Sequence, residues 1–355
     1  MLPVRSIGLD STPAKDCLPH RKRWRLRGRP VKFMKLSTTT RASEPANAIE
    51  APSAGRCKLV VVTPARNEAD LIENTIQSVI RQKARPLRWV IVSDGSTDGT
   101  DDIVRRYAEE HPWIELVCLP PRRERHFAGK VMAFNAGYAR LRDLDFDVLA
   151  NLDADITFDD EYFAFVLDKL AHNPRLGVAG TPFSEHGRGY DYRFTSVEHV
   201  SGGCQFFRRE CFEEVGGYTP IEIGGVDLVA VMTARMKGWQ TRTFTEKPYA
   251  HHRRLGTAKQ NAVMVAFRGG HGDYRLGGDP LWEFCRCLYQ TTRSPIVLGG
   301  LFRWVGFMKA MLGRAPMLVS DGLIKFRRAE QRRRLRAFLR GLVRPGTPRS
   351  FATEN

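Results

Sequence analysis

The sequence of 355 residues predicts an α/β fold with a doubly wound, mostly parallel sheet and helices on both of its faces. Apolar runs such as 59–62 and 89–92 are typical of central parallel strands, which are buried on both sides. Segments with apolar residues at helical spacing follow these runs. A hydrophobic content of 42% is enough for a sizeable core.

The expected elements follow in order along the chain. We predict strands at 59–62, 89–92, 114–119 and 146–152, with helices that open at 67–70 and cover 101–110 and 130–141. Further on we predict a helix at 162–171, a strand at 176–180, helices at 209–215 and 226–237, and a strand at 240–244. The short connections between these segments favour parallel pairing of the first strands.

Composition divides the chain into four parts. Residues 1–56 form a basic extension that we expect to remain unstructured, because 37–56 are rich in Ser, Thr, Ala and Pro. Residues 57–255 form the main α/β domain, with a first half at 57–155 and a second half at 156–255. Residues 256–345 form an amphipathic helical extension, and 346–355 form a tail.

The net charge of +17 is concentrated at the two ends of the chain. Residues 1–35 and 324–355 each carry ten Lys or Arg against two acids, which leaves about +1 for the remainder. A nucleic-acid-binding domain is expected to carry its basic patch on a folded face, so this pattern argues against nucleic acid as a partner. Basic ends on a nearly neutral body fit an anionic membrane surface at least as well.

Residues 294–313 form the most apolar late segment, but Arg303 and Lys309 interrupt it. This pattern fits a helix that lies in the membrane interface and fits equally well a helix packed on the domain. Residues 327–344 continue as a basic helix that is compatible with anionic lipid.

The cysteine pattern and the N-terminus indicate the compartment. The seven cysteines contain no C-x-x-C pair, which is typical of free thiols in a reducing cytosol. No apolar stretch of a secretory signal follows the basic N-terminal residues. We therefore expect a cytoplasmic protein that is peripheral on the inner face of the cell membrane.

Asp153 and Asp155 follow a buried strand at the point where a parallel sheet binds ligands. Two carboxylates at this spacing can share one hard divalent cation, which could in turn hold a diphosphate. Alone, an Asp-x-Asp motif is more often a solvated turn. Here other candidate site segments accompany the motif, because 63–68, 93–96 and 129–130 lie at neighbouring strand ends or helix starts.

This combination resembles the inverting glycosyltransferases of family 2, which have the GT-A fold, over about residues 57–255. The family's Pro-x-Tyr-Asn-Glu motif matches 64–68 with Arg66 in place of the tyrosine, and its Asp-Asp-Gly-Ser motif matches 93–96 with Ser93 first. The resemblance implies a nucleoside-diphosphate sugar donor, with Asp94 recognising the base and Lys130 near the phosphates. The implied donor-binding residues are Pro64, Ala65, Arg66, Glu68, Asp94, Lys130 and Asp153.

The resemblance also implies a Mn²⁺ or Mg²⁺ cofactor. Asp155 is then the expected metal ligand, and Asp153 contacts the ribose or the metal. A histidine often supplies a third ligand in GT-A enzymes, and of His251 and His252 we favour His252.

The family's catalytic base is the Asp of a Glu-Asp pair that lies twelve residues, counted inclusively, before a helix-ending Gly. Counting back from Gly238 gives Asp227, which would deprotonate the acceptor hydroxyl. Val226 replaces the expected Glu, and Glu222 is the alternative base. An Asp at this place could also be a simple helix N-cap.

Gly202 and Gly203 resemble the acceptor-side loop of the family, where glycine permits close backbone approach. The Gln-x-x-Arg-Trp motif of processive members does not follow, so we expect one sugar to be added per encounter. The expected acceptor is a hydroxyl of a lipid-linked or cell-envelope glycan.

Other functions stay open at this point. A nucleic-acid-binding protein that uses the basic tails is one alternative, and it predicts strongly salt-dependent binding. A non-catalytic relative that scaffolds an assembly is another, suggested by Val226. A dinucleotide-dependent oxidoreductase is disfavoured, because no G-x-G-x-x-G motif follows the first strand.

Overall fold

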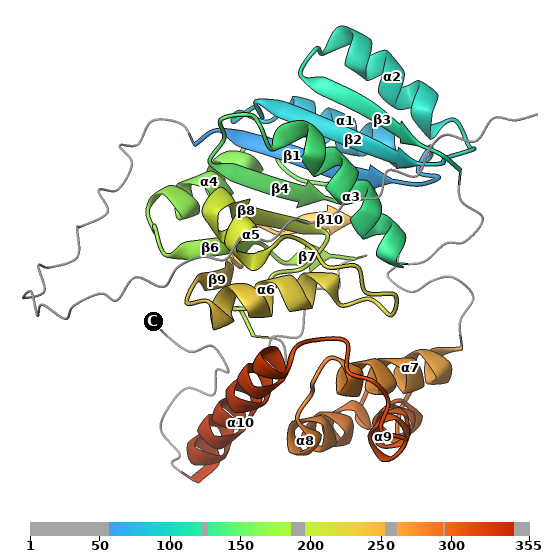
Figure 1. Cartoon of the computed structure of the whole chain (residues 1–355), viewed down its shortest axis with the longest axis vertical. Coiled ribbons are helices and arrows are strands. Elements are labelled where there is room, and N and C mark those ends of the chain that lie inside the picture. The colour runs from blue at the N-terminus through green and yellow to red at the C-terminus, as the bar shows by residue number, and fades with distance from the viewer. Residues whose placement is uncertain (1–56, 122–126, 186–195, 253–260, 294, 344–355) are drawn as a thin grey trace, which may run out of the picture. The chain divides into compact units, whose positions relative to one another are not determined.

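The structure is a computed structural model that describes residues 57–121, 127–185, 196–252, 261–293 and 295–343 (Figure 1). The predicted basic extension 1–56 and the tail 346–355 lie outside the described residues. The predicted fold class is confirmed: an α/β domain with a mostly parallel sheet is followed by a region of helices (Figure 1).

The bounds of the elements follow chain order. The strands are β1 (Leu59–Ala65), β2 (Arg88–Asp94), β3 (Ile114–Leu119), β4 (Val148–Leu152), β5 (Ile156–Thr157), β6 (Leu176–Gly180), β7 (Phe183–Ser184), β8 (Cys204–Arg208), β9 (Gln240–Thr243) and β10 (Tyr249–His251). The helices are α1 (Ile72–Ile80), α2 (Thr100–Glu110), α3 (Phe127–Leu141), α4 (Tyr162–Ala171), α5 (Arg209–Val215), α6 (Val226–Met236), α7 (Ala262–Arg275), α8 (Pro280–Gln290), α9 (Leu298–Leu312) and α10 (Asp321–Val343).

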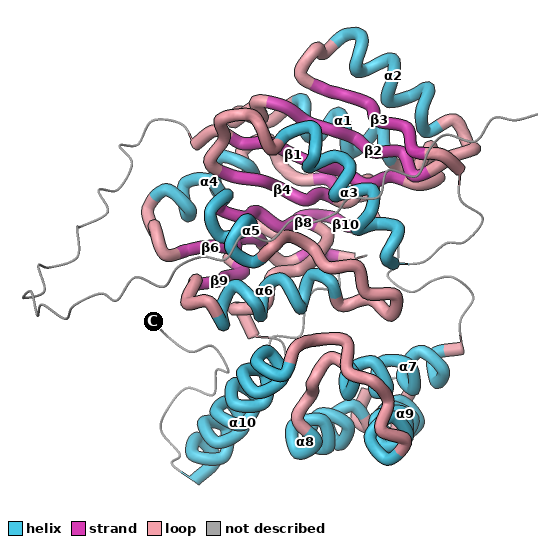
Figure 2. The backbone as a smooth tube through the Cα atoms, viewed as in Figure 1, coloured by secondary structure: helices cyan, strands magenta, loops and turns pink. Residues whose placement is uncertain are grey.

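The main sheet has seven strands in the order β3-β2-β1-β4-β8-β6-β9 (Figure 2). β1 pairs in parallel with β2 on one side and with β4 on the other, so the chain reverses its direction of winding between β1 and β4. Ligands of open α/β sheets bind at such a switch point, outside the carboxyl ends of the strands. β8 runs antiparallel to both of its neighbours.

Alternate strand residues fill two hydrophobic cores, one on each face of the sheet. Val61 and Ile91 pack with α1, α2 and α4 on one face, whereas Val62 and Val92 pack with α3, α5 and α6 on the other. Strands covered on both faces need apolar residues at successive positions, which explains the continuous β-branched runs in the sequence.

Several features of the domain differ from the sequence prediction, and the short strands β5, β7 and β10 are among those not predicted. β8, a central strand, was not predicted, because the sequence around it reads as a glycine-rich segment followed by a helix. α1 begins at Ile72 rather than at 67–70. Asn67 has a positive φ of 55°, and side chains between the end of β2 and the first residue of α2 accept hydrogen bonds from the N–H groups of residues 67–69. These groups therefore need no helical partner.

The predicted C-terminal helical region is confirmed as α7 to α10. Within the described ranges, no helix combines the length and the apolar content needed to cross a bilayer. Several arginines of α10 form ion pairs with acids of the protein itself. Arg327 pairs with Asp273 and Arg332 pairs with Asp279, so this part of the basic helix is already charge-compensated.

α10 is also tied to the α/β domain. The guanidinium of Arg235 on α6 forms two hydrogen bonds with the carboxylate of Glu330, each 2.9 Å long. Both side chains are nearly buried, at 11% and 8% exposure. Arg334 adds an ion pair of 2.6 Å with Glu198, which lies four residues before Gly202.

Candidate active site

The loops after β1 and β2 form one interlocked unit. Pro64 and Ala65 end β1 in register with Val92 and Ser93 of β2. The Asn67 side chain accepts a hydrogen bond from the N–H of Thr97, and the N–H of Asn67 donates to Ser96 Oγ. The two sequence motifs that were matched to the donor therefore lie side by side.

Arg66 and Asp94 form an ion pair across this unit. An Nη atom of Arg66 lies 3.6 Å from a carboxylate oxygen of Asp94, and both side chains are largely buried. Glu68 of the same loop is buried, and its N–H donates to Thr100 Oγ1. Gly95 turns the chain with φ of 66°, and a Cβ there would lie 2.6 Å from Pro121 Cα, so only glycine fits.

Asp153 and Asp155 lie at the end of β4, in a loop whose backbone contacts Thr75 of α1. The hydroxyl of Thr75 lies 2.8 Å from the carbonyl oxygen of Ala154 and 2.9 Å from that of Ile156. The N–H of Asp153 donates to the carbonyl of Gly203. These contacts fix the backbone on both sides of the acidic pair.

The small sheet β5-β10-β7 brings a histidine to this pair. β10 is antiparallel to β5 with His251 opposite Ile156, so the imidazole lies beside Asp155. Ligand atoms of Asp153, Asp155 and His251 all lie within 4.8 Å of one another. His251 Nδ1 is 3.5 Å from Glu185, which can orient the ring.

The geometry favours His251 over His252 as the third ligand, which differs from our expectation. Successive side chains of a strand point to opposite faces, so only one of two adjacent histidines can meet the aspartates. His252 instead places Nε2 2.8 Å from Thr157 Oγ1.

Lys130, at the start of α3, forms an ion pair with Asp153. Removal from water lowers the pKa of Lys130, but the carboxylates of Asp153 and Asp227 outweigh this effect and keep its pKa above the usual value. Burial raises the pKa of Asp153, and the charge of Asp155 raises it further, while Lys130 lowers it; the net shift is upward. An additional cation would relieve this excess of negative charge.

A pocket of about 210 Å³ joins the predicted base to the predicted donor site. Its lining includes Lys130, Asp153, Gly202, Gly203 and Asp227. Gly202 N–H donates to Asp227 Oδ2 at 3.1 Å, and the carbonyl of Gly202 accepts from the side chain of Asn151 at 2.7 Å.

Glu222, the alternative base, and Val226, which stands where the family has Glu, lie in different surroundings. Glu222 is exposed and is not among the residues that line this pocket, so the geometry favours Asp227. Val226 does line the pocket. Arg66, Asp94, Asp155 and His251 also lie outside the lining, in the two neighbouring groups described above.

Several residues of the site were not found by sequence reasoning. Asn151 and Thr75 hold loop backbone, and buried residues of these types give no sequence signal of that role. Tyr218 lines the pocket and donates a hydrogen bond to Gln205. Burial and the carboxylates of Asp227 and Asp153 hold the pKa of Tyr218 well above its usual value, so it stays a neutral donor.

Fold and site together define an α/β domain with an acidic, metal-competent site at the switch point of its sheet. Residues 60–199 match the family described as "Glycosyl transferase family 2". This match covers less than half of the chain, and it agrees with the family resemblance and the enzyme class predicted from the sequence.

Curated relatives match the same part of the chain. Poly-beta-1,6-N-acetyl-D-glucosamine synthase of Staphylococcus aureus (strain MSSA476) is 29% identical over 136 residues, which are 38% of this chain and 31% of that protein. The protein of the same name from Staphylococcus epidermidis is 26% identical over the same length. The match thus spans about a third of the length of these relatives.

Two solved structures align with most of the chain. One is the mannosyltransferase PcManGT from Pyrobaculum calidifontis in complex with GDP-Man and Mn²⁺, with 20% identity, a TM-score of 0.48, and coverage of 83% of this chain and 78% of that one. The other is S. aureus TarS 1-349 in complex with UDP-GlcNAc, with 14% identity, a TM-score of 0.47, and coverage of 72% and 73%.

Proposed function

We propose that this protein is a metal-dependent inverting glycosyltransferase that moves one hexose from a nucleoside-diphosphate sugar to a hydroxyl of a glycan acceptor. The observation that carries the proposal is the pocket that Asp227 and Asp153 line together with Lys130, Gly202 and Gly203. A base on one side and a diphosphate anchor on the other are what an inverting displacement requires.

Each group in the pocket has a role in this reaction. Asp227 accepts the proton of the acceptor hydroxyl as its oxygen attacks the anomeric carbon, while the bond from that carbon to the diphosphate breaks. Lys130 contributes positive charge on the side of the leaving group. The N–H of Gly202 orients the carboxylate of Asp227 and leaves its other oxygen for the acceptor.

The proposal assigns binding of the nucleotide to the loops after β1 and β2. A carboxylate such as Asp94 can accept a hydrogen bond from a ring N–H of the base, and Arg66 holds it in place. Pro64, Ala65 and Glu68 shape the same loop. The proposal therefore assigns the donor to the carboxyl ends of β1, β2 and β4.

The residues at the acidic pair fit a divalent cation. Two carboxylates and one imidazole, with ligand atoms within 4.8 Å of one another, suit Mn²⁺ and leave Mg²⁺ possible through the oxygen ligands. When bound there, the cation would neutralise charge that develops on the leaving diphosphate. We assign the ligands to Asp155, Asp153 and His251.

The acceptor and the location are the further parts of the proposal. We assign the acceptor to a lipid-linked or cell-envelope glycan and the protein to the inner face of the cell membrane. The basic ends and the apolar segment 294–313 support this assignment. The lack of Gln-x-x-Arg-Trp after the catalytic domain in this sequence supports the transfer of one sugar per encounter.

A panel of UDP- and GDP-linked sugars tests the activity. We expect Mn²⁺-dependent release of the nucleoside diphosphate from one donor, and loss of this release in the presence of a chelator. A scaffold without activity would hydrolyse none of the donors, even where calorimetry detects binding. The product formed with a glycan acceptor would then show by its length whether a single sugar is added.

A further inference from the structure

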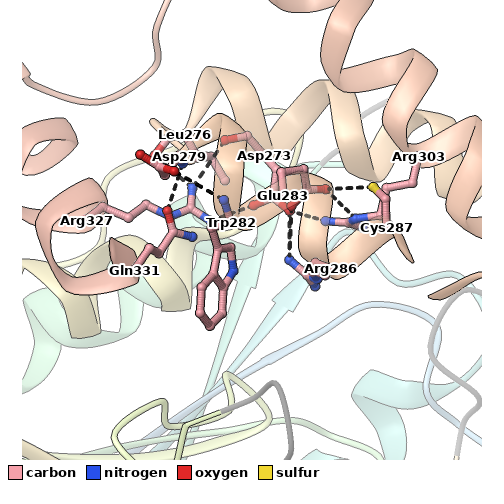
Figure 3. Close-up of polar contacts among 10 residues, drawn as sticks. All are labelled: Asp273, Leu276, Asp279, Trp282, Glu283, Arg286, Cys287, Arg303, Arg327 and Gln331. Carbon is pink, nitrogen blue, oxygen red and sulfur yellow. Dashed lines mark hydrogen bonds and ion pairs between the residues drawn. The ribbon is translucent and has the colours of Figure 1, made fainter. Parts of the chain in front are cut away.

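The C-terminal helices bury a cluster of charged side chains, while several of their large apolar side chains are exposed. Arg303 contacts both Asp273 and Glu283, at 2.6 Å from Nε to the Glu283 carboxylate (Figure 3). Arg286 and Arg327 complete the cluster at 2.9 Å and 2.5 Å from the carboxylate of Asp273 (Figure 3). Asp273, Glu283, Arg303 and Arg327 are all less than a tenth exposed.

Glycines explain why no apolar core separates α7 from α9. A Cβ on Gly270 of α7 would lie 1.8 Å from the carbonyl oxygen of Arg303, and a Cβ on Gly306 of α9 would lie 2.0 Å from that of Phe267. The two helices therefore touch backbone to backbone. Close packing through small residues is the mode that helices use in an apolar environment, where burial of large side chains gives no advantage.

Six large apolar side chains of α8 and α9 are exposed, although Trp282 and Phe307 are buried. On α8 they are Leu281, Phe284 and Leu288, which are 57%, 43% and 55% exposed, and on α9 they are Leu301, Phe302 and Val305, which are 48%, 37% and 45% exposed. We name these six residues the apolar face. Leu281, Phe284 and Leu288 are spaced three and four residues apart, and Val305 lies four residues after Leu301 and three after Phe302, so each set lies toward one side of its helix. Phe284 packs on Trp304 of α9 at 5.4 Å between ring centroids.

The exposure is specific to this region of the protein. Of the eighteen exposed large apolar side chains among the described residues, fourteen lie in 261–343. Isolated exposed leucines are ordinary, but a contiguous apolar surface marks a place of interaction.

Cationic residues at the border of the apolar face indicate which partner it contacts. Lys309 lies on the same side of α9 as Leu301 and Val305, and the exposed Arg293 follows α8 directly. An amphipathic surface of leucine and phenylalanine bordered by Lys and Arg suits the boundary between headgroups and acyl chains of an anionic bilayer. In a contact between two copies, Lys309 would have to be buried among apolar groups, which is unfavourable.

We propose that the apolar face of α8 and α9 inserts into the interface of an anionic membrane, so that the helical region is a monotopic anchor. This proposal deepens the membrane location in the proposed function and rests on it. The buried ion pairs keep the charged groups of the helices away from the lipid, and the α6–α10 contacts connect the anchor to the catalytic domain.

Vesicle binding by the full chain tests the anchor. We would sediment the protein with vesicles of phosphatidylcholine mixed with phosphatidylglycerol, and with vesicles of phosphatidylcholine alone. The double variant Leu301→Ser/Phe302→Ser should bind the mixed vesicles about tenfold or more weakly, because two apolar side chains no longer insert. Lys309→Gln should weaken binding about fivefold, and only to the anionic vesicles.

Leu87→Ser is the matched control, since Leu87 is 50% exposed but belongs to the α/β domain. It should bind as the unchanged protein does. Equal vesicle binding by the double variant, or no vesicle binding by the unchanged protein, would overturn the proposal. A lipid-free dimer that the double variant abolishes, without vesicle binding, would assign the face to self-association instead.

Mn²⁺-dependent UDP or GDP binding, measured without lipid, separates this test from that of the proposed function. The double variant should retain it, which also shows that the protein is folded. Failure of nucleotide binding in the unchanged protein would count against the proposed function alone.

Discussion

Asp227 and Gly202 face each other so closely that the glycine has no room for a side chain. The N–H of Gly202 donates to Asp227 Oδ2 at 3.1 Å, and a Cβ on Gly202 would lie 2.9 Å from Asp227 Cβ. Because Asn151 holds the carbonyl of Gly202, the loop and the proposed base cannot move independently. We therefore expect Gly202 to position the proposed base.

Gly202→Ala should lower turnover with little change in donor binding. The added methyl displaces the carboxylate of Asp227, and a displacement of about 1 Å can cost about a hundredfold in rate. Steady-state kinetics and calorimetry with the nucleoside diphosphate measure the two effects. Gly322→Ala is the control, because its Cβ would meet only Met236 Sδ at 4.0 Å. Unchanged turnover in Gly202→Ala would reject the positioning role.

The two histidines should differ sharply in their effect on the metal. His251→Gln removes an imidazole from the acidic pair and should weaken Mn²⁺ binding at least about tenfold. His252→Gln is the matched control and should leave the Mn²⁺ affinity almost unchanged, since its ring contacts Thr157. Calorimetric titration of Mn²⁺ gives both values. The opposite ranking would restore His252 as the ligand.

The choice between these histidines shows where sequence reasoning reaches its limit. β1 and β2 can be predicted from their runs of β-branched residues, because the sheet is covered on both faces. β10 has three residues, which is too few to show an alternation, and its register depends on pairing with a distant strand. The contact between Gly202 and Asp227 could not be predicted either, because the two residues are 25 positions apart in the sequence.

Motifs with local geometry could be predicted well. The turn after β2 needs φ of 66° at Gly95 and 95° at Gly99. Because glycine adopts positive φ readily, the two glycines indicate this turn in the sequence. β8 could not be predicted, because its pairing partners β4 and β6 determine that the segment is a strand.

Thr75→Val should weaken both the fold and the metal site. The substitution keeps the shape of the side chain but leaves the buried carbonyls of Ala154 and Ile156 without the hydroxyl. We expect a loss of about 1–3 kcal/mol in the free energy of unfolding. Urea titration measures this loss, and Mn²⁺ titration measures the effect on the acidic pair. Thr292→Val, at an exposed position, should change neither quantity; an equally small effect of Thr75→Val would contradict its role.

His199 should make the stability depend on pH. Removal from solvent lowers its pKa below the ordinary 6.5, and the guanidinium groups of Arg235 and Arg334 lower it further, against the raising effect of Asp227. The unfolded chain therefore takes up a proton at a higher pH than the folded protein. The contribution to stability is complete above 6.5 and falls as the pH drops from there toward the folded pKa.

Urea unfolding at about pH 8 and about pH 5.5 measures this dependence. His199→Gln should lose less stability between the two conditions than the unchanged protein does. His172→Gln is the control, because the side chain of His172 is 73% exposed. If both variants follow the pH dependence of the unchanged protein, His199 does not contribute to it.

The most direct test of the central claim compares the unchanged protein with Asp227→Asn in Mn²⁺-dependent transfer from the preferred donor to an acceptor. The amide has the size of the carboxylate but cannot take the proton of the acceptor. We predict at least about a hundredfold loss of transfer, with nucleoside-diphosphate binding retained, while Asp143→Asn at an exposed carboxylate has no effect. Near-normal transfer by Asp227→Asn would contradict the account.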